Sequence, residues 1–449
     1  MSDATAPASP ALPPWRQRLR MFRGAFRKKL LQLAEQLAYD AAGLPMALPF
    51  GRPVLPPEAH HAQFLHDYYR RHFWRQPSSV LRGPLVLVLW PFALAFTIVQ
   101  YTLRNGSGIR TRSGKGPLRQ MLEQACQAWR NSIAPPWYYM FELYTGHRGK
   151  IAGEYLTAHE TIAGAYDLLE PVGTADQMAD KVWFAEHCLK LGIKVVPVLF
   201  YVSRGAVHFV VPPTDPAYDT DLFVKPRSGN GGHHAERWDR LGEGDYRNSK
   251  GLTLSRDALF AHLAAQSLRE DFIIQPRLVN HPALDDIANG ALSTLRVLTC
   301  KDETGKAIAT NVAFRMAVGT NNVVDNFHQG GLAAPVDLST GTIGPASDIG
   351  RYPDIGWREI HPVSGAHFAG RELPFWKEAI ALACEAGDAF PWRTAIGWDV
   401  AMLRDGPMII EGNGKPDLDI HQRCERRPLG RQRIAELLAF NVKAAIKDR

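Results

Sequence analysis

The chain has 449 residues, of which 45% are hydrophobic and 22% are charged, and its formal net charge is +7. This length is enough for two or three domains with a sizeable core, and the composition is typical of a globular protein. The five cysteines, Cys126, Cys188, Cys300, Cys384 and Cys424, show no CxxC spacing. Their scatter argues against a zinc site and against a disulfide scaffold, and it fits a reducing compartment.

The first part of the chain carries much of the excess positive charge. Residues 1–14 are small and rich in proline, so we expect a disordered tail. Between Trp15 and Lys29 there is no acid, and apolar residues recur in steps of three and four as far as Leu37. A basic helix with one apolar face suits an anionic membrane surface. A helix packed on its own protein is the alternative, and a nucleic-acid arm is disfavoured because no nucleic-acid module is recognisable.

A long uncharged segment follows at Pro84–Leu103, PLVLVLWPFALAFTIVQYTL, and is flanked by arginines on both sides. Its 20 residues could cross a bilayer as a helix. Pro91 would kink that helix, and a re-entrant hairpin would explain the positive charge at both ends. A buried helix of a soluble core is the alternative. Asn105–Pro117, rich in glycine, serine and basic residues, is predicted to be a linker that closes region 15–117.

The rest of the chain indicates an α+β protein with prominent antiparallel strands. Region 118–215 is predicted to be mainly helical, with Pro135 and Pro136 interrupting the first helix, a helix at Asp180–Lys190 and a strand at Ile193–Tyr201. Region 216–449 is predicted to be a second domain of short strands and glycine turns. Its expected helices lie near Asp257–Leu268, Pro374–Ala386 and Gln432–Lys447.

The segment Phe223–Trp238, FVKPRSGNGGHHAERW, places a lysine directly before a glycine-rich turn. A P-loop has its lysine after the glycines and continues into a helix, so this segment is not a P-loop. Lys225 instead ends an apolar strand, and the residues after His233 resemble a returning strand. The pattern predicts a hairpin whose tip could cover a ligand, although an ordinary surface hairpin has the same pattern.

A second polar constellation lies in Ile396–Asn413, IGWDVAMLRDGPMIIEGN. Glu411 and Asn413 are two residues apart on a predicted strand and therefore share one face. Asp399 lies on the partner strand, and it pairs opposite Glu411 if the loop is the three residues Arg404–Gly406. A two-residue loop would put Asp399 on the wrong face. Two carboxylates and an amide oxygen would suit Mg²⁺, which takes further ligands from water and phosphate.

The order of these motifs carries a family resemblance. Between Lys225 and Asp399 lie FIIQPRL (Phe272–Leu278), STLRVLT (Ser293–Thr299) and NFHQGG (Asn326–Gly331). The ordered set resembles the ATP-grasp superfamily, and within it the sugar-transfer-associated ATP-grasp group, which is similar to α-L-glutamate ligase-like proteins. The resemblance implies an α+β, two-lobe fold in which antiparallel sheets clamp ATP, preceded here by the helical, membrane-associating N-terminal region.

The resemblance also implies roles for individual residues. The expected metal ligands are Asp399, Glu411 and Asn413, and the residues expected at ATP are Lys181, Lys225, Ser228, Gly229, Gly231, Gly232, Gln275, Arg277, Leu278 and Arg296. Asp285 or Asp286 would reach the ribose, and NFHQGG would lie near the acceptor. Many relatives have an arginine two positions before the first metal acid, where this chain has Gly397. Arg296 or Arg315 would then compensate the charge, and these two are the expected catalytic residues.

Three functions fit this set of residues. The first is an ATP- and Mg²⁺-dependent ligase that joins a carboxylate to an amine or related nucleophile through an acyl phosphate. It would act at the cytoplasmic face of the membrane, or in the cytoplasm, on a sugar, polysaccharide precursor or lipid-linked substrate. The second is a kinase on the same fold that phosphorylates a sugar or small-molecule hydroxyl. The third, a non-enzymatic ATP-binding protein, is disfavoured by the intact set of lysine and metal ligands. No nucleic-acid partner is expected.

Overall fold

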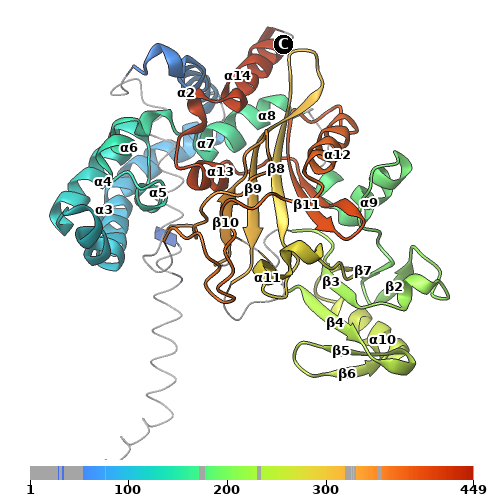
Figure 1. Cartoon of the computed structure of the whole chain (residues 1–449). Coiled ribbons are helices and arrows are strands. Elements are labelled where there is room, and N and C mark those ends of the chain that lie inside the picture. Colours follow the sequence, from blue (N-terminus) through green and yellow to red (C-terminus); the bar gives the residue numbers. More distant parts are fainter. Residues whose placement is uncertain are drawn as a thin grey trace, which may run out of the picture.

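The computed structural model describes residues 54–447, except 76, 171–176, 230–233, 319–324, 326, 328–329 and 351–355, together with residues 29, 33 and 34. Within this part of the chain two antiparallel sheets form two lobes, and a layer of helices packs against the larger lobe (Figure 1). The predicted α+β class is confirmed. The predicted tail 1–14 and nearly all of the basic segment Trp15–Lys29 lie outside the described residues.

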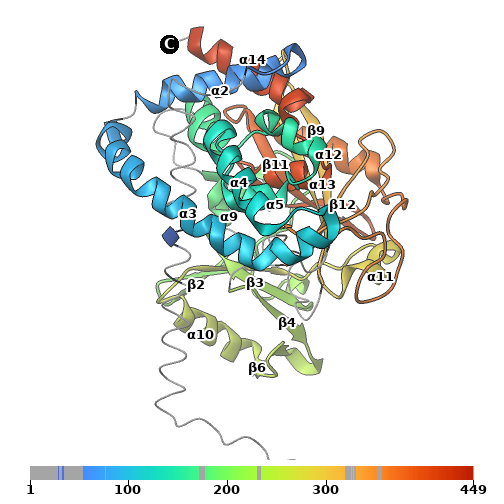
Figure 2. The ribbon, with the colours of Figure 1, turned by 90° about the vertical axis from the view of Figure 1, so that its left-hand side faces the viewer.

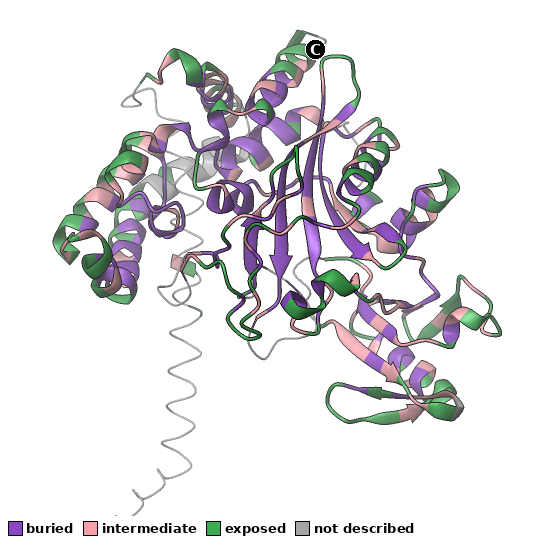
Figure 3. Cartoon of the chain, in the orientation of Figure 1, coloured by how far each residue is buried: buried purple, intermediate pink, exposed green. Residues whose placement is uncertain are grey.

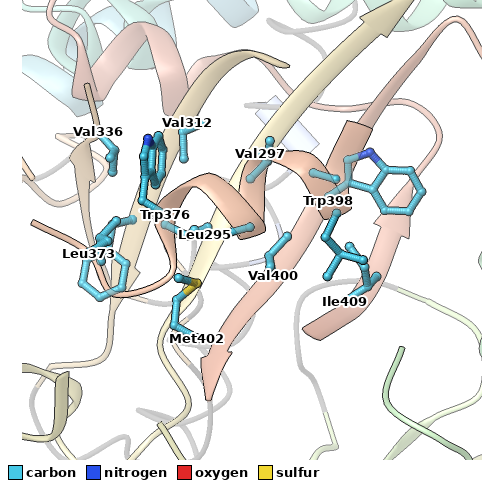
Figure 4. Packing of buried hydrophobic residues seen from close by; sticks show 14 of the residues in the cluster. Leu295, Val297, Val312, Val336, Leu373, Trp376, Trp398, Val400, Met402 and Ile409 are labelled. Atoms are coloured by element: carbon cyan, nitrogen blue, oxygen red, sulfur yellow. The ribbon is translucent and has the colours of Figure 1, made fainter. Parts of the chain in front are cut away.

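The larger lobe is built on a five-stranded sheet of order β10-β9-β8-β11-β12. Its strands are β8 (Thr294–Lys301), β9 (Ala307–Met316), β10 (Leu332–Pro335), β11 (Ala395–Leu403) and β12 (Gly406–Asn413). Helix α12 (Trp376–Asp388) covers one face. Alternate residues such as Val297 and Val400 point to that face and pack with Trp376 in a buried cluster (Figure 4).

The opposite face of the five-stranded sheet has two environments. Toward one end, Leu298, Cys300 and Ala395 pack against α14 (Arg433–Lys447), and α13 (Asp419–Cys424) lies against β9 and β10. Toward the other end, the same alternation places polar residues of β8, β9, β11 and β12 on the face that looks toward the smaller lobe. One face of the sheet therefore serves both as core and as the wall of a cavity.

The smaller lobe is a seven-stranded sheet of order β2-β1-β7-β3-β4-β5-β6. Its strands are β1 (Phe200–Ser203), β2 (Ala206–Phe209), β3 (Leu222–Pro226), β4 (Glu236–Arg240), β5 (Asp245–Asn248), β6 (Thr253–Ser255) and β7 (Phe272–Pro276). Leu222 and Val224 pack with residues of α10 (Arg256–Gln266) in one cluster. Phe223 and Lys225 therefore point to the other face, toward the larger lobe. Strands β1 and β2 belong to this sheet although they precede the expected boundary at residue 216.

The connection into the smaller lobe differs in part from the sequence prediction. Helix α9 (Lys181–Lys190) forms as predicted, because the Asp180 side chain caps it by accepting from the backbone N–H groups of Val182 and Trp183. The predicted strand Ile193–Tyr201 is wrong for most of its length, since β1 begins only at Phe200. Val195 instead forms an isolated parallel bridge with Ile409 of the larger lobe. This apolar run is buried as a crossing segment between the two sheets.

The helical layer comprises α2 (His60–Phe73), α3 (Pro77–Ser113), α4 (Pro117–Asn131), α5 (Pro135–Met140), α6 (Gly146–Lys150), α7 (Ala158–Glu160) and α8 (Tyr166–Leu169). Helix α2 packs on α14, and α3 packs on α4 and α5 (Figure 2). Pro135 and Pro136 occupy the first turn of α5, where proline is well tolerated, so they start a helix there.

Two predictions for residues 84–117 are wrong in the structure. The expected linker Asn105–Pro117 is largely helical, since α3 continues to Ser113. The side-chain amide of Asn105 donates to the Tyr101 carbonyl one turn earlier in the same helix. The expected re-entrant hairpin is a single helix that keeps both Pro84 and Pro91 inside it. Among the described residues no helix is long and apolar enough to cross a membrane.

A buried charge network fixes the helical layer to the larger lobe. The Glu142 carboxylate accepts a hydrogen bond from Trp357 Nε1 at 2.7 Å and lies 3.6 Å from Arg423 Nη1. Arg148 also pairs with Glu142. Burial alone would raise the pKa of Glu142, but Arg423 and the other partners hold it below its ordinary value. The helices therefore form part of the same folded unit as the sheets.

Close packing at Gly430 gives a test of this junction. A Cβ at Gly430 would lie 2.2 Å from the Glu154 carbonyl oxygen and 2.8 Å from Ala62 Cβ. We expect Gly430→Ala to lower the free energy of unfolding by about 1–3 kcal/mol, because backbone and core must shift to admit the methyl group. Chemical denaturation measures this change. Gly242→Ala is the matched control, since nothing lies within 4 Å of its Cβ; equal effects for both variants would contradict the packing.

Candidate active site

A cavity of about 700 Å³ lies between the inner faces of the two sheets. The smaller lobe contributes Lys225, Gln275 and Phe223, and the larger lobe contributes Arg296, Asp399 and others. Of the residues predicted for the site, the described part of the cavity wall contains Lys181, Lys225, Ser228, Gly229, Gln275, Arg277, Leu278, Arg296, Arg315, Asp399, Glu411 and Asn413. Residues separated by more than 200 positions are thus brought to one place.

Lys225 is a buried cation at the end of β3 that points across the cavity. Its Nζ lies 3.9 Å from Glu411 Oε2. Burial lowers the pKa of Lys225, while the Glu411 and Asp399 carboxylates oppose that shift. Lys181, at the start of α9, donates through Nζ to the Gly229 carbonyl at 2.8 Å. Lys181 therefore ties the base of the glycine-rich turn to the cavity wall.

Asp399 and Glu411 lie directly opposite each other, as predicted, but for a different reason. Leu403 pairs with Gly406, so the loop has two residues and not the expected three. A register shift between Asp399 and Val400 leaves Ile410 as an extra residue in β12. Ile409 consequently packs in the core, whereas Glu411 turns to the cavity face beside Asp399. The β-bulge supplies the odd residue that the prediction had assigned to the loop.

Two arginines from neighbouring strands compensate the buried Asp399 carboxylate. Arg296 Nε lies 2.9 Å from Asp399 Oδ1, and Arg315 Nη2 lies 2.9 Å from Asp399 Oδ2. Arg315 also lies 3.6 Å from Asp325 Oδ1. Burial by itself would lower the pKa of Arg315, but Asp325 and Asp399 raise it above its ordinary value. Burial raises the pKa of Asp325, although Arg315 and the Thr294 hydroxyl act in the opposite direction.

The departure at Gly397 has a structural explanation. A Cβ at Gly397 would lie 3.2 Å from Arg296 Nη1 and 3.0 Å from Pro416 Cβ. The space beside Asp399 is therefore occupied by the guanidinium of Arg296, which comes from the adjacent strand β8. The sequence named Arg296 and Arg315 as alternatives for charge compensation. In the structure both arginines pair with Asp399.

The predicted metal ligands fit a hard cation. Asp399, Glu411 and Asn413 present oxygen donors on one face, at consecutive cavity-facing positions of β11 and β12. Asp399 Oδ1 is buried and makes no hydrogen bond within the described residues, because the nearby Arg296 Nε is not aligned with it. Although this oxygen is ion-paired with Arg296, no described donor hydrogen-bonds to it, so it could also coordinate a cation. With only two carboxylates, the set would need further oxygen ligands from water or phosphate, as Mg²⁺ sites commonly have.

The remaining predicted residues divide into three groups. Gln275 is buried and donates to the Val196 carbonyl at 3.3 Å, and Arg277 bridges Asp221 and Asp239 within the smaller lobe. Asp285, in α11 (Asp285–Ala288), lines the cavity, whereas Asp286 pairs with Arg371 on the exterior. Gly231 and Gly232 lie outside the described residues.

Several cavity residues were missed from the sequence. Asp325 accepts hydrogen bonds from both the backbone N–H and the hydroxyl of Thr294. Asp417 and Ile420 also line the cavity, as does Phe327, which belongs to the NFHQGG segment named from the sequence. Asp325 directly precedes the NFHQGG motif, and an acid next to that motif was the available signal. Asp417 and Ile420 closely follow Asn413, the last of the predicted metal ligands, but their position depends on how the chain turns into α13.

A family comparison decides the assignment. A model of the family described as sugar-transfer associated ATP-grasp matches residues 166–433. The chain belongs to the sugar-transfer associated ATP-grasp family. The matched range includes both sheets and every predicted cavity residue. No curated protein matches the chain.

Solved structures show weaker similarity to this family member. D-alanyl-alanine synthetase A from Vibrio cholerae O1 biovar eltor shares 11% identity over 60% of this chain and 66% of that chain, with a TM-score of 0.35. The D-alanine–D-alanine ligase from Coxiella burnetii shares 11% over 60% and 59%, with a TM-score of 0.32. The ATP-grasp ligase PsnB, solved with a minimal precursor, Mg and ADP, shares 12% over 67% and 72%, with a TM-score of 0.33. The chain spans less than two thirds of the first two proteins.

The charge cluster of this sugar-transfer associated ATP-grasp protein gives a second test. We expect Arg315→Met to destabilise the fold by about 3–5 kcal/mol, because it leaves Asp325 buried without its cation. The double variant Arg315→Met/Asp325→Asn should recover part of this loss. Arg371→Met breaks the more exposed pair with Asp286 and should cost less than about 1 kcal/mol. Denaturant titration of the wild-type protein and the three variants checks this order of stability. An Arg315→Met variant as stable as the wild type would refute the proposed charge compensation.

Proposed function

We propose that the protein is an ATP- and Mg²⁺-dependent ligase that joins a substrate carboxylate to an amine or a related nucleophile. The observation that carries the proposal is the cavity between the lobes, where lysines and arginines converge on a hard-oxygen donor set. The cations of this cavity complement the negative charge of a nucleoside triphosphate, and its oxygen donors suit the bound metal. Family membership supports the same activity.

The chain's own residues would divide the work as follows. Asp399, Glu411 and Asn413 would hold Mg²⁺, which neutralises charge that develops on the phosphates during transfer. Lys225 and Lys181 would bind phosphate oxygens from the smaller lobe, and Arg296 and Arg315 would bind them from the larger lobe. The two sheets would thereby close on opposite sides of one polyanion.

The proposed chemistry proceeds in two balanced steps. The substrate carboxylate oxygen attacks the γ-phosphorus of ATP, the bond to the β-phosphate oxygen breaks, and an acyl phosphate and ADP form. The amine then attacks the acyl carbon, loses a proton and expels phosphate. The described cavity lining contains no cysteine and no histidine, and this chemistry needs no protein nucleophile. The enclosed site and the turn at Ser228–Gly229 would limit access of water to the acyl phosphate.

The substrate and location belong to the same proposal. We infer a sugar-linked or lipid-linked acceptor in the synthesis of a cell-surface polysaccharide or glycolipid, handled at the cytoplasmic face of the membrane. The family's association with sugar transfer supports the acceptor class. The basic segment Trp15–Lys29 and the apolar helix α3 support contact with a membrane surface.

Product analysis tests the reaction class. Purified protein is incubated with ATP, candidate amino acids and a sugar-lipid extract, and ADP, AMP, free phosphate and phosphorylated substrate are measured separately. We expect ADP and free phosphate, with formation dependent on both a carboxylate and an amine. Phosphate retained on a hydroxyl of the substrate would establish the kinase instead. AMP would show that the nucleotide chemistry is adenylation and would refute the proposal.

Glu411→Gln tests the metal site. This change removes a charge at a cavity-facing ligand and keeps the side-chain shape, so turnover should fall by at least about a hundredfold while the unfolding midpoint changes little. Glu378→Gln, on the exposed side of α12, is the matched control and should keep full activity. If the Glu411→Gln variant keeps full activity at limiting Mg²⁺, Glu411 is not a metal ligand.

A further inference from the structure

Helix α4 is folded with its polar side inward. Gln120 and Gln124 are buried, and Gln124 Nε2 donates to Thr102 Oγ1 of α3 at 2.8 Å. Leu118 and Leu122, in contrast, are 77% and 72% exposed. A helix on the surface of a protein in water normally buries its apolar stripe and exposes its polar one. The reversal indicates that the outer side of α4 faces something other than water.

Helix α3 has the same outward apolar stripe. Val88, Phe92, Val99 and Leu103 are spaced by four, seven and four residues, which places them on one helical face, and all four are exposed. The opposite side of α3 is buried, with Tyr101 stacked near Tyr139 of α5. The stripe therefore points away from the catalytic sheets.

The two stripes lie on the same side of the helix pair. The helices run antiparallel, since Trp90 lies beside Trp129 at one end and Gly106 beside Pro117 at the other. On each helix, rotation in the same direction about the helix axis leads from the residues that contact the partner helix to the exposed apolar residues. Because the two helices are antiparallel, the exposed apolar residues of both lie on one side of the pair. Both buried and exposed residues lie along the described parts of this helix pair (Figure 3). We call this surface, formed by Val88, Phe92, Val99, Leu103, Leu118, Leu122, Cys126 and Trp129, the outer face.

The two helices that carry the outer face are basic in sequence. Residues 77–131 contain seven basic residues, Arg82, Arg104, Arg110, Arg112, Lys115, Arg119 and Arg130, and only one acid, Glu123. That acid is already neutralised, because Lys115 Nζ lies 2.6 Å from its carboxylate. A second copy of this face, or the basic segment Trp15–Lys29, would bring positive charge against positive charge. An apolar surface with a basic surround instead complements anionic lipid.

The inner side of α3 is linked to the cavity wall through one buried cluster. Tyr101 and Ile109 of α3 belong to one buried cluster with Phe327 and Ile420, and these last two residues line the cavity. One continuous buried cluster, which also includes residues of α5 and α13, therefore connects α3 with the cavity wall. We propose that the outer face of α3 and α4 rests on the surface of an anionic bilayer without crossing it. Delivery of a lipid-linked acceptor to the cavity from that surface rests on the proposed ligase function.

Cys126 offers a native reporter for this contact. Cys126 is the exposed cysteine among the five. Cys384 is half-buried, and burial raises the pKa of its thiol, so Cys126 should react first. The full-length protein is labelled there with an environment-sensitive fluorophore and mixed with vesicles of equal parts phosphatidylglycerol and phosphatidylcholine. We expect a blue shift and protection from an aqueous quencher. Vesicle binding without any change at Cys126 would assign the contact to another segment and overturn the proposal.

Matched variants test the energetics. Phe92→Glu/Leu122→Glu should weaken partitioning onto the vesicles by at least about tenfold, since two apolar contacts are lost. Leu268→Glu changes an equally exposed leucine in the smaller lobe and should leave partitioning unchanged. Unchanged binding of the double variant, or a dimer that forms through this face without vesicle binding, would overturn the proposal. If the double variant does not fold, the labelled native protein still decides the question.

ATP turnover with the candidate amino acids and the sugar-lipid extract is measured on the same proteins. Vesicle binding without turnover would refute the ligase and leave the membrane contact standing, whereas turnover without vesicle binding would do the reverse. The two proposals can therefore fail independently.

Discussion

The site depends on the burial of one carboxylate among cationic side chains. Asp399 is almost completely buried, and a buried carboxylate is unfavourable unless cations and hydrogen bonds surround it. Arg296 on β8 and Arg315 on β9 provide those cations, and both must lie on the same face of the sheet as Asp399. The register of three strands is therefore tied to one charge cluster, and a slip of one residue would send these side chains into the opposite, apolar core.

The same constraint explains the β-bulge at Ile410. Without the extra residue, Glu411 would share the face of Ile409 and enter the cluster around Trp398. With it, Glu411 lies opposite Asp399 and Lys225 of the other lobe comes within 3.9 Å. A bulge costs one ladder pairing, and here it places two acids, an amide and a lysine around one cavity. Each lobe carries part of the constellation, so a ligand that binds both parts would also hold the lobes together.

The helical layer joins the larger lobe through buried apolar clusters and through polar contacts, and α3 and α4 keep further apolar residues on their outer side. Glu142 accepts from Trp357 and lies between arginines, which locks the layer to the larger lobe. The buried glutamines of α4 satisfy the hydroxyl of Thr102 and the carbonyl of Gly106. Buried polar groups with partners cost little, and they fix the orientation of the helix pair. The outer leucines and aromatic residues are left to face the surroundings.

The sequence by itself determined the local features: helix α9 with its Asp180 cap, helices α10, α12 and α14, the hairpin after Lys225, and the chemical types gathered in the site. These follow from periodicity, capping and turn residues, which act over a few positions. Other features lay beyond it. Helix α3 continues through Asn105 and Gly106 because α4 packs against it, and Asp325 reaches the cavity because β8 and β9 pair. The loop at Arg404–Asp405 has two residues because a bulge elsewhere corrects the register. Tertiary structure decided these points, since each depends on contacts between segments far apart in the chain, which local propensity does not encode.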